Sequence, residues 1–255
     1  MQATADPIKA TTSFSLVKLL LGVGVIAASL LAADWVSSGI SYLHSRYRAR
    51  ATIPERLEQY GPEARTRWKP YFDRAGVTYP PTKVVLVGLK QEKQLEVYAT
   101  SDAAAPRLIR AFPILAASGS LGPKLRQGDM QVPEGLYRIE SLNPNSAYHL
   151  SLRVNYPNAA DREQARIDGR KNLGGDIMIH GNRVSIGCLA MGDSAAEDLF
   201  TLAADTKLSK IEVILAPVDF RVSTLPAHYD ATLPAWIKSL YQEIGLQLSR
   251  LSNTR

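Results

Sequence analysis

Between residues 82 and 220 the chain consists of short apolar segments, each of which ends near glycine, proline or asparagine. These segments share a high content of Val, Ile and Leu, and they are "VVLVGL", "QLEVYA", "RLIRAFPILA", "GLYRIESL", "AYHLSLRV", "DIMIHG" and "IEVILAP". Short strands separated by turn residues are typical of β-sandwiches and barrels. We therefore predict a mostly-β domain over 82–220, sandwich-like or barrel-like, in which the first two segments form a hairpin.

A helical segment is expected immediately before this domain. Residues 36–81 have helical spacing, but Pro54, Gly61-Pro62 and Pro70 interrupt it. Proline removes a helical hydrogen bond, so these positions predict breaks. We expect a broken helical linker here, next to a membrane segment rather than part of a domain.

Two more helices are expected, one inside the domain and one after it. The segment "SAAEDLFTLAADT" predicts a helix that begins with a capping box between Ser194 and Glu197. Residues 221–255 form a C-terminal extension, in which Pro234 and the apolar spacing from Trp236 predict a last amphipathic helix.

The first 35 residues contain a long apolar run. No residue from Leu19 to Ala33 is charged, and about twenty apolar residues suffice to cross a bilayer. A shorter run that ends in small residues also fits a signal peptide. We predict a transmembrane or signal helix in 1–35. The protein is then exported to the periplasm, either anchored to the inner membrane through this helix or released by cleavage.

The positive charge lies unevenly along the chain. The net charge is +6, and residues 1–52 carry five Lys or Arg against two Asp, a balance of +3. Domains that bind nucleic acid gather basic side chains on one face between aromatic ones. The rest of the sequence shows no such pattern, so we predict no nucleic-acid partner.

The only cysteine of the chain, Cys188, lies in "IHGNRVSIGC". A single thiol in an exported protein cannot form an intramolecular disulfide, so it is either buried in the core or reactive. His180 ends a predicted strand, and Gly187 lets the backbone approach closely. An imidazole that takes the thiol proton would let the sulfur attack a carbonyl. The backbone N–H groups of Gly187 and Cys188 are expected to hold the resulting oxyanion.

The motif and two further stretches, "SGSLGPKLRQGDMQVPEGLYRI" and "LNPNSAYHLSLRVNYPN", resemble the L,D-transpeptidase (YkuD-like) catalytic domain over roughly residues 80–220. More narrowly, they are similar to the murein L,D-transpeptidase-like branch with a short His-to-Cys spacing. The resemblance implies a mostly-β fold without a cofactor that acts on peptidoglycan peptide stems. It also implies Cys188 as the nucleophile of a thioacyl-enzyme and His180 as the base, with the Gly181 carbonyl orienting the imidazole.

Two positions depart from the pattern of the family. The chain reads Ser185-Ile186-Gly187-Cys188 where the family has Ser-His-Gly-Cys, and it has Ala190 where the family has arginine. The second histidine and a contact to a stem carboxylate are therefore lost. Because the base and the nucleophile remain, we expect the chemistry to be kept and the choice of substrate to differ.

Five residues are candidates for substrate binding: Tyr148, His149, Lys124, Arg126 and Ser185. His149 is polar on an apolar strand, where a hydrogen-bonded structural histidine is the alternative. Lys124 and Arg126 lie in a glycine-rich loop and are expected either to meet stem carboxylates or to be solvated. His149 together with the motif's histidine and cysteine matches no zinc spacing, so we predict no metal site.

Three functions stay open at this point. The first is an acyltransferase that joins peptide stems through an L,D bond. The second is a hydrolase that uses the same thiol to cut such links or to release a wall-linked lipoprotein. The third is a wall-binding module without catalysis, in which Cys188 is only core packing.

Overall fold

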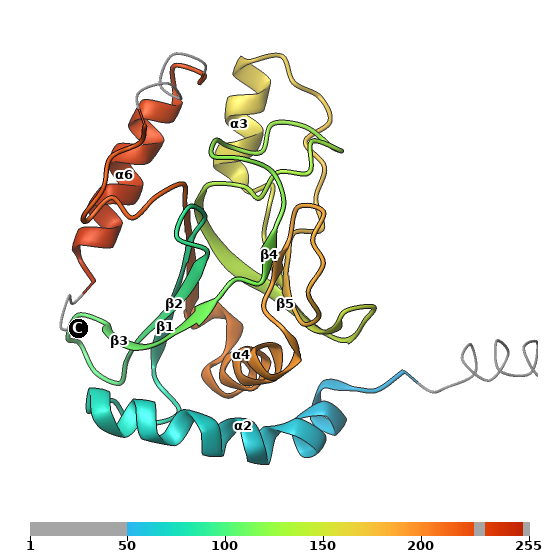
Figure 1. Ribbon diagram of the computed structural model, residues 1–255, viewed down its shortest axis with the longest axis vertical. Helices are drawn as coiled ribbons and strands as arrows, with labels where there is room; N and C mark the ends of the chain where they lie inside the picture. Colours follow the sequence, from blue (N-terminus) through green and yellow to red (C-terminus); the bar gives the residue numbers. More distant parts are fainter. Residues whose placement is uncertain (1–49, 227–232, 252–255) are drawn as a thin grey trace, which may run out of the picture. The chain divides into compact units, whose positions relative to one another are not determined.

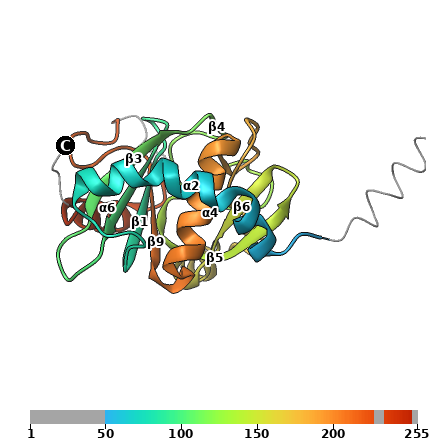
Figure 2. The same cartoon turned by 90° about the horizontal axis from the view of Figure 1, so that it is seen from below.

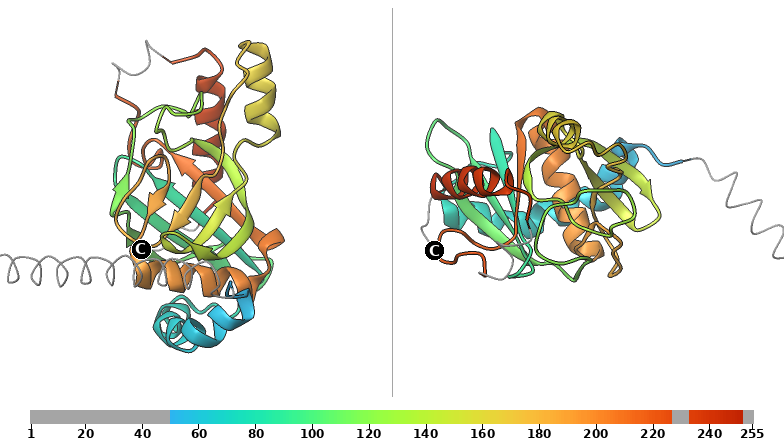
Figure 3. Two further views of the ribbon diagram at one scale, coloured as in Figure 1. Left: turned by 90° about the vertical axis from the view of Figure 1, so that its right-hand side faces the viewer. Right: turned by 90° about the horizontal axis from the view of Figure 1, so that it is seen from above.

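Nine strands of the described residues form one mixed sheet in the order β3-β2-β1-β9-β5-β6-β7-β8-β4. Strands β1 to β5 are labelled in Figure 1. In chain order they are β1 (Lys83–Leu89), β2 (Gln94–Thr100), β3 (Arg107–Pro113), β4 (Ala116–Ala117), β5 (Gly135–Ser146), β6 (His149–Val154), β7 (Met178–His180), β8 (Leu189–Ala190) and β9 (Ile211–Ala216). β1 and β2 pair antiparallel, which confirms the predicted hairpin. The sheet curls into a half-barrel (Figure 3). The barrel-like form of the prediction therefore holds, and the sandwich form is wrong.

The computed structural model describes residues 50–226 and 233–251. The expected membrane or signal helix in 1–35 lies outside these residues. Among the residues that the structure describes, no helix is both long enough and apolar enough to span a bilayer. The described part of the chain from residue 51 onward forms one unit.

Both faces of the sheet are buried along β1, and alternate side chains of this strand enter two different cores. Leu86 belongs to a first core shared with α2 (Ile53–Ala75) and α4 (Asp193–Thr206). Its neighbour Val87 belongs to a second core shared with α6 (Ile237–Ser249). Successive residues of a strand point to opposite faces, so one strand serves two cores.

The second core involves β1, β2 and β9, and it does not reach β6 and β7. In β6, Leu150 and Leu152 join the first core, whereas Ser151 and Arg153 point the other way and line a cleft. This half of the sheet therefore rests on α4 with one face and is open on the other. The open face becomes the floor of the cleft.

α2 is one continuous helix, although Pro62 and Pro70 lie within it on its exposed side. The predicted breaks are therefore wrong. Trp68 and Phe72 are buried in the first core, and Trp68 Nε1 donates to the Asp198 carbonyl at 2.8 Å. The free energy gained by burying two large aromatic side chains offsets the cost of the helical hydrogen bonds that the prolines remove. The part of the expected linker that forms α2 is thus packed beneath the sheet, beside α4 (Figure 2).

The helix expected from "SAAEDLFTLAADT" is confirmed as α4, but it begins differently. Its N-cap is Gly192, which makes no side-chain cap bond, so the predicted capping box between Ser194 and Glu197 is wrong. The Glu197 carboxylate instead lies 3.0 Å from His149 Nε2 and 3.0 Å from Arg67 Nη2. Contacts to β6 and α2 thus replace the local cap.

The last predicted helix is confirmed as α6, which buries Tyr241 and Ile244. A further helix, α3 (Ala159–Ile167), was not expected. Its signal is a capping box in which the side chains of Asn158 and Asp161 each accept from the other residue's backbone N–H. A single 3₁₀ turn, η1 (Leu208–Lys210), precedes β9.

Candidate active site

Cys188 and His180 line the same cleft, which has a volume of about 850 Å³. His180 is the last residue of β7, and Cys188 directly precedes β8. These two strands pair in parallel, with Ile179 opposite Leu189. Strand pairing therefore brings the only thiol and the imidazole to one edge of the open face.

The thiol of Cys188 is half-buried and held by backbone groups at the start of β7 and just before it. Its Sγ accepts a hydrogen bond from the N–H of Met178 at 3.4 Å and donates to the carbonyl of Asp176 at 3.5 Å. Burial raises the pKa of this thiol, the Met178 N–H lowers it, and the charge of Asp176 raises it further. The thiol is therefore protonated at rest near neutral pH.

The imidazole of His180 is almost fully enclosed, with 1% of the residue exposed. Its Nδ1 lies 2.6 Å from the carbonyl of Gly181, which only accepts, so we place the proton on Nδ1 and the lone pair on Nε2. Burial lowers the pKa of His180, partly opposed by the bond to Gly181. The imidazole is thus neutral and able to take a proton near neutral pH.

Gly181 has no room for a side chain. A Cβ there would lie 2.6 Å from Asp193 Oδ1 and 2.9 Å from the carbonyl oxygen of Tyr148. Both atoms belong to segments that pack against the end of β7. Glycine therefore lets the chain turn here while its carbonyl faces His180.

Tyr148 lies over the imidazole. Its ring stacks on His180 with centroids 4.8 Å apart and planes inclined by 30°. The residue is 37% exposed and lines the cleft. A ring in this place shields the imidazole of His180 from water and faces the cleft, so a contact between Tyr148 and a substrate stays a prediction.

The hydroxyl of Ser185 folds the loop between the histidine and the cysteine. It donates to the carbonyl of Cys188 at 2.6 Å and accepts from the N–H groups of Cys188 at 3.1 Å and Gly187 at 3.3 Å. The two N–H groups expected to hold an oxyanion are therefore occupied in the resting site. Ser185 is not among the residues that line the cleft.

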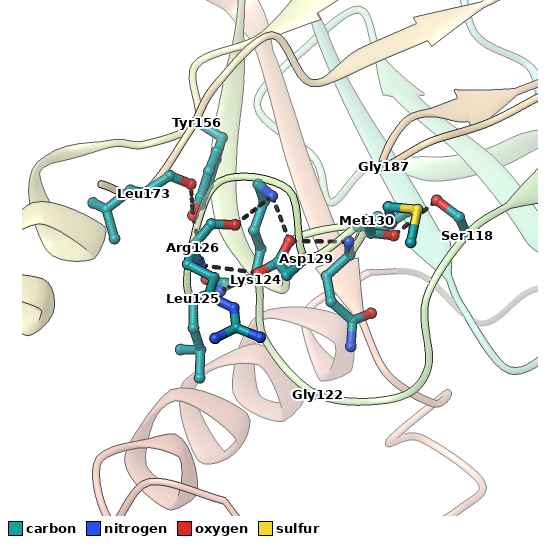
Figure 4. A network of polar contacts seen from close by, with 12 residues as sticks. Ser118, Gly122, Lys124, Leu125, Arg126, Asp129, Met130, Tyr156, Leu173 and Gly187 are labelled. Atoms are coloured by element: carbon teal, nitrogen blue, oxygen red, sulfur yellow. Dashed lines mark hydrogen bonds and ion pairs between the residues drawn. The ribbon is translucent and has the colours of Figure 1, made fainter. Parts of the chain in front are cut away.

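Lys124 lines the cleft, but its ammonium is already paired within its loop (Figure 4). Nζ lies 2.5 Å from Asp129 Oδ1 and donates to the carbonyl of Arg126 at 3.0 Å. Asp129 also accepts from the N–H groups of Leu125 and Arg126. Lys124 therefore shapes the loop, while the exposed side chain of Arg126 lies outside the cleft lining.

His149 points away from the cleft toward the helices. Its ring meets the ring of Tyr60 of α2 edge-on at 5.0 Å, in addition to its contact with Glu197. Its backbone has φ +71°, which tightens the turn between β5 and β6. The hydrogen-bonded structural alternative therefore describes its surroundings, and the predicted substrate contact does not.

Several polar residues that line the cleft were not predicted as site residues, among them Ser151, Arg153 and Asp176. Ser151 lies opposite His180 in the strand register. Arg153 Nη1 pairs with Asp176 Oδ1 at 2.9 Å. Only the period-two pattern of β6, with polar residues between buried leucines, could have pointed to the first two. Within the described parts of the chain, no three His, Cys, Asp or Glu side chains are placed to hold a metal ion.

Residues 82–215 match the family model of the L,D-transpeptidase catalytic domain, and this stretch is more than half of the chain. The chain belongs to the L,D-transpeptidase catalytic-domain family. The expected resemblance is thereby confirmed, and the match contains both β7 and β8 with the residues of the cleft.

Among curated relatives of this L,D-transpeptidase-family chain is the putative L,D-transpeptidase YafK of Escherichia coli (strain K12). The two are 37% identical over 113 residues, which is 44% of this chain and 43% of the relative. This chain therefore aligns with less than half of the length of that relative.

Solved structures with a similar fold include the helical cell shape determining protein Pgp2 of Campylobacter jejuni, at 22% identity and a TM-score of 0.43. That match covers 58% of this chain and 54% of Pgp2. Another is L,D-transpeptidase 1 of Mycobacterium tuberculosis, at 16% identity and a TM-score of 0.31. That match covers 52% of this chain and 62% of the other.

Proposed function

We propose that this protein is a peptidoglycan-modifying cysteine enzyme that transfers acyl groups between peptide stems through a thioester on Cys188. The observation that carries the proposal is the cleft in which Cys188 and a neutral, oriented His180 lie on paired strands. Membership of the family and the relative named as a putative L,D-transpeptidase support it.

Because the Cys188 thiol and the His180 imidazole are both neutral at rest, the proton moves between them during the attack. As Cys188 Sγ attacks the donor carbonyl, Nε2 of His180 takes the thiol proton, because a free thiolate is disfavoured by burial. The C–N bond of the donor then breaks, and the imidazolium returns the proton to the leaving amine. The carbonyl of Gly181 stabilises the imidazolium through Nδ1–H.

The alternative of a non-catalytic wall-binding module fits these surroundings less well. A core cysteine is enclosed by apolar side chains, whereas the thiol here contacts two backbone polar groups and borders an open cleft. Placement of the protein in the periplasm, with the N-terminal segment at the inner membrane, is part of the proposal.

Incubation of the full chain, purified in detergent, with muropeptides tests the reaction. Mass spectrometry should show a covalent acyl-enzyme at Cys188 and a gain of cross-linked dimers. A gain of shortened monomers, or release of a wall-linked lipoprotein from intact peptidoglycan, would instead indicate the hydrolase. Absence of any adduct at Cys188 would refute thiol catalysis.

A further inference from the structure

Asp176 lies beside the nucleophile but does not help to activate it. Its backbone carbonyl accepts the S–H of Cys188 at 3.5 Å, which fixes this residue against the thiol. Its side chain is 77% exposed and borders the cleft. The negative charge opposes formation of a thiolate, because like charges in proximity disfavour ionisation. A role in the acylation step therefore does not explain a carboxylate here.

The charges around Asp176 do not cancel. Arg153 Nη1 lies 2.9 Å from Asp176 Oδ1, but Arg153 Nε also lies 3.1 Å from Glu140 Oε2. One guanidinium thus serves two carboxylates, and one negative charge is left over. Lys124 is paired with Asp129 and does not neutralise it. Glu140 is not among the residues of the cleft, so Asp176 presents this charge to a molecule bound there.

In the second half of an acyl transfer to an amine, positive charge develops next to the thioester, where a negative charge would stabilise it. The acceptor ammonium first releases one proton to solvent. Its nitrogen then attacks the thioester carbon, and it is positively charged once the N–C bond has formed. It passes one further proton to His180, the C–S bond breaks, and the imidazolium returns that proton to the sulfur of Cys188. The products are an amide and the free thiol.

A carboxylate next to the thioester favours this route in two ways. It holds the ammonium form of the acceptor in the cleft, and it stabilises the positive charge that develops on the attacking nitrogen. Water attacks as a neutral molecule that loses its proton to the base, so it gains less from the same carboxylate. The charge therefore discriminates between the two acceptors.

We propose that Asp176 binds the ammonium group of the acceptor and directs the thioacyl-enzyme toward primary amines rather than water. The inference rests on the proposed function and sharpens it, since it assigns to one residue of the cleft the choice between an amine and water as acceptor. Arg153 acts as a positioning residue that orients the carboxylate of Asp176.

The test uses the full chain in detergent with a disaccharide-tetrapeptide muropeptide, which carries both a donor carbonyl and a free side-chain amine. The ratio of cross-linked dimer to hydrolysed monomer measures the choice of acceptor. Asp176→Asn should lower this ratio roughly tenfold, the value of one charge-assisted hydrogen bond. Glu163→Gln is the control, because it removes an exposed carboxylate that is paired with Arg166 and lies outside the cleft lining, and its ratio should stay at the wild-type value.

Acylation is measured separately, as the mass gained by each protein with a carbapenem. Asp176→Asn should acylate at least as fast as the wild type, because removal of the like charge lowers the thiol pKa. Asparagine also adopts the left-handed backbone of this position, φ +56°, so the variant should fold.

An unchanged ratio in Asp176→Asn, an equal fall in Glu163→Gln, or a wild type that acylates yet forms only hydrolysed monomer would overturn the inference alone. A wild type that is not acylated would refute the proposed thiol chemistry, and the inference would fall with it. The two failures are therefore told apart by the acylation measurement.

Discussion

At the residue scale, the two groups that we propose to react are both uncharged at rest. Burial raises the pKa of Cys188 above its usual 9.0 and lowers that of His180 below its usual 6.5, although the Gly181 carbonyl partly opposes the second shift. A standing thiolate–imidazolium pair is thus disfavoured. The proton has to move during attack, so the geometry of the imidazole matters more than the acidity of the thiol.

Cys188→Ser should abolish turnover and covalent labelling by a carbapenem while the fold survives. A serine hydroxyl can keep the bonds to the Met178 N–H and the Asp176 carbonyl, but its pKa is far too high for His180 to activate it. Mass spectrometry and thermal unfolding check both expectations. A variant that is strongly destabilised yet active would show that the thiol is only core packing.

The pH profile of kcat/KM should fall on its acid side below pH 6.5, because the base must be neutral and its pKa is lowered. Tyr148→Ala should shift that limb upward toward 6.5, since removal of the stacked ring lets water reach His180 and relieves desolvation. Tyr148→Phe keeps the ring and should keep the wild-type limb. If the alanine variant leaves the limb unmoved, the ring does not set the pKa of the base.

At the scale of elements, short segments around the cleft are set by contacts with distant parts of the chain. The loop between β7 and β8 is folded on the hydroxyl of Ser185. The turn between β5 and β6 is fixed by His149, whose partner Glu197 belongs to α4 and is also bound by Arg67 of α2. Both helices therefore help to place the ring of Tyr148 over the base.

Ser185→Ala should lower turnover at least tenfold and reduce the free energy of unfolding by about 1–2 kcal/mol, because three backbone groups of the loop lose a partner. Steady-state kinetics and urea unfolding measure the two effects. Ser249→Ala is a suitable comparison, since the hydroxyl of Ser249 donates to the carbonyl of Leu246 within α6. Wild-type turnover in Ser185→Ala would mean that the loop is held without its hydroxyl.

Trp68→Ala should cost about 3–5 kcal/mol of unfolding free energy, the usual range for a fully buried aromatic residue. The side chain packs edge-on against Phe72 and Phe112 and donates to the Asp198 carbonyl. Glu58 is exposed on the same helix, and Glu58→Ala should change stability by less than about 0.5 kcal/mol. Similar small effects of both substitutions would mean that α2 is not part of the folded domain.

At the scale of the whole molecule, the cleft exists because the two halves of the sheet are covered unequally. α6 packs over β1, β2 and β9, and it leaves the outer face of β6 and β7 open. The polar residues Ser151 and Arg153 occupy that open face, while their apolar neighbours close the core beneath. One sheet thereby provides both a stable core and a solvent-filled site.

Export is expected from the apolar run in residues 1–35. A reporter enzyme that works only in the periplasm, fused after residue 255, should therefore be active. Replacement of two leucines of the run, Leu20 and Leu30, by aspartate should abolish its activity, because charges in an apolar span oppose membrane insertion. Activity of a reporter enzyme that works only in the cytoplasm, fused at the same place, would contradict action on the cell wall.

The sequence by itself determined the local features of this protein. The strands longer than two residues, the hairpin and the helices α4 and α6 follow from apolar periodicity and turn residues, which act over a few neighbours. The candidate nucleophile and base also follow from local signals, namely a lone thiol and a histidine at a strand end. Such interactions can be inferred without knowledge of the rest of the fold.

Only the tertiary structure decided which groups are free to act. Lys124, His149 and Ser185 look free to bind a substrate in the sequence, yet each side chain is held by a partner in the fold. The partners are the Asp129 carboxylate, the Glu197 carboxylate and the Cys188 carbonyl, in that order. Asp176 became a candidate because folding of the loop before β7 brings its carbonyl to Cys188. α2 is likewise continuous despite its prolines, because burial of its apolar side chains outweighs the local tendency of proline to end a helix. Packing, rather than periodicity, thus determines the site.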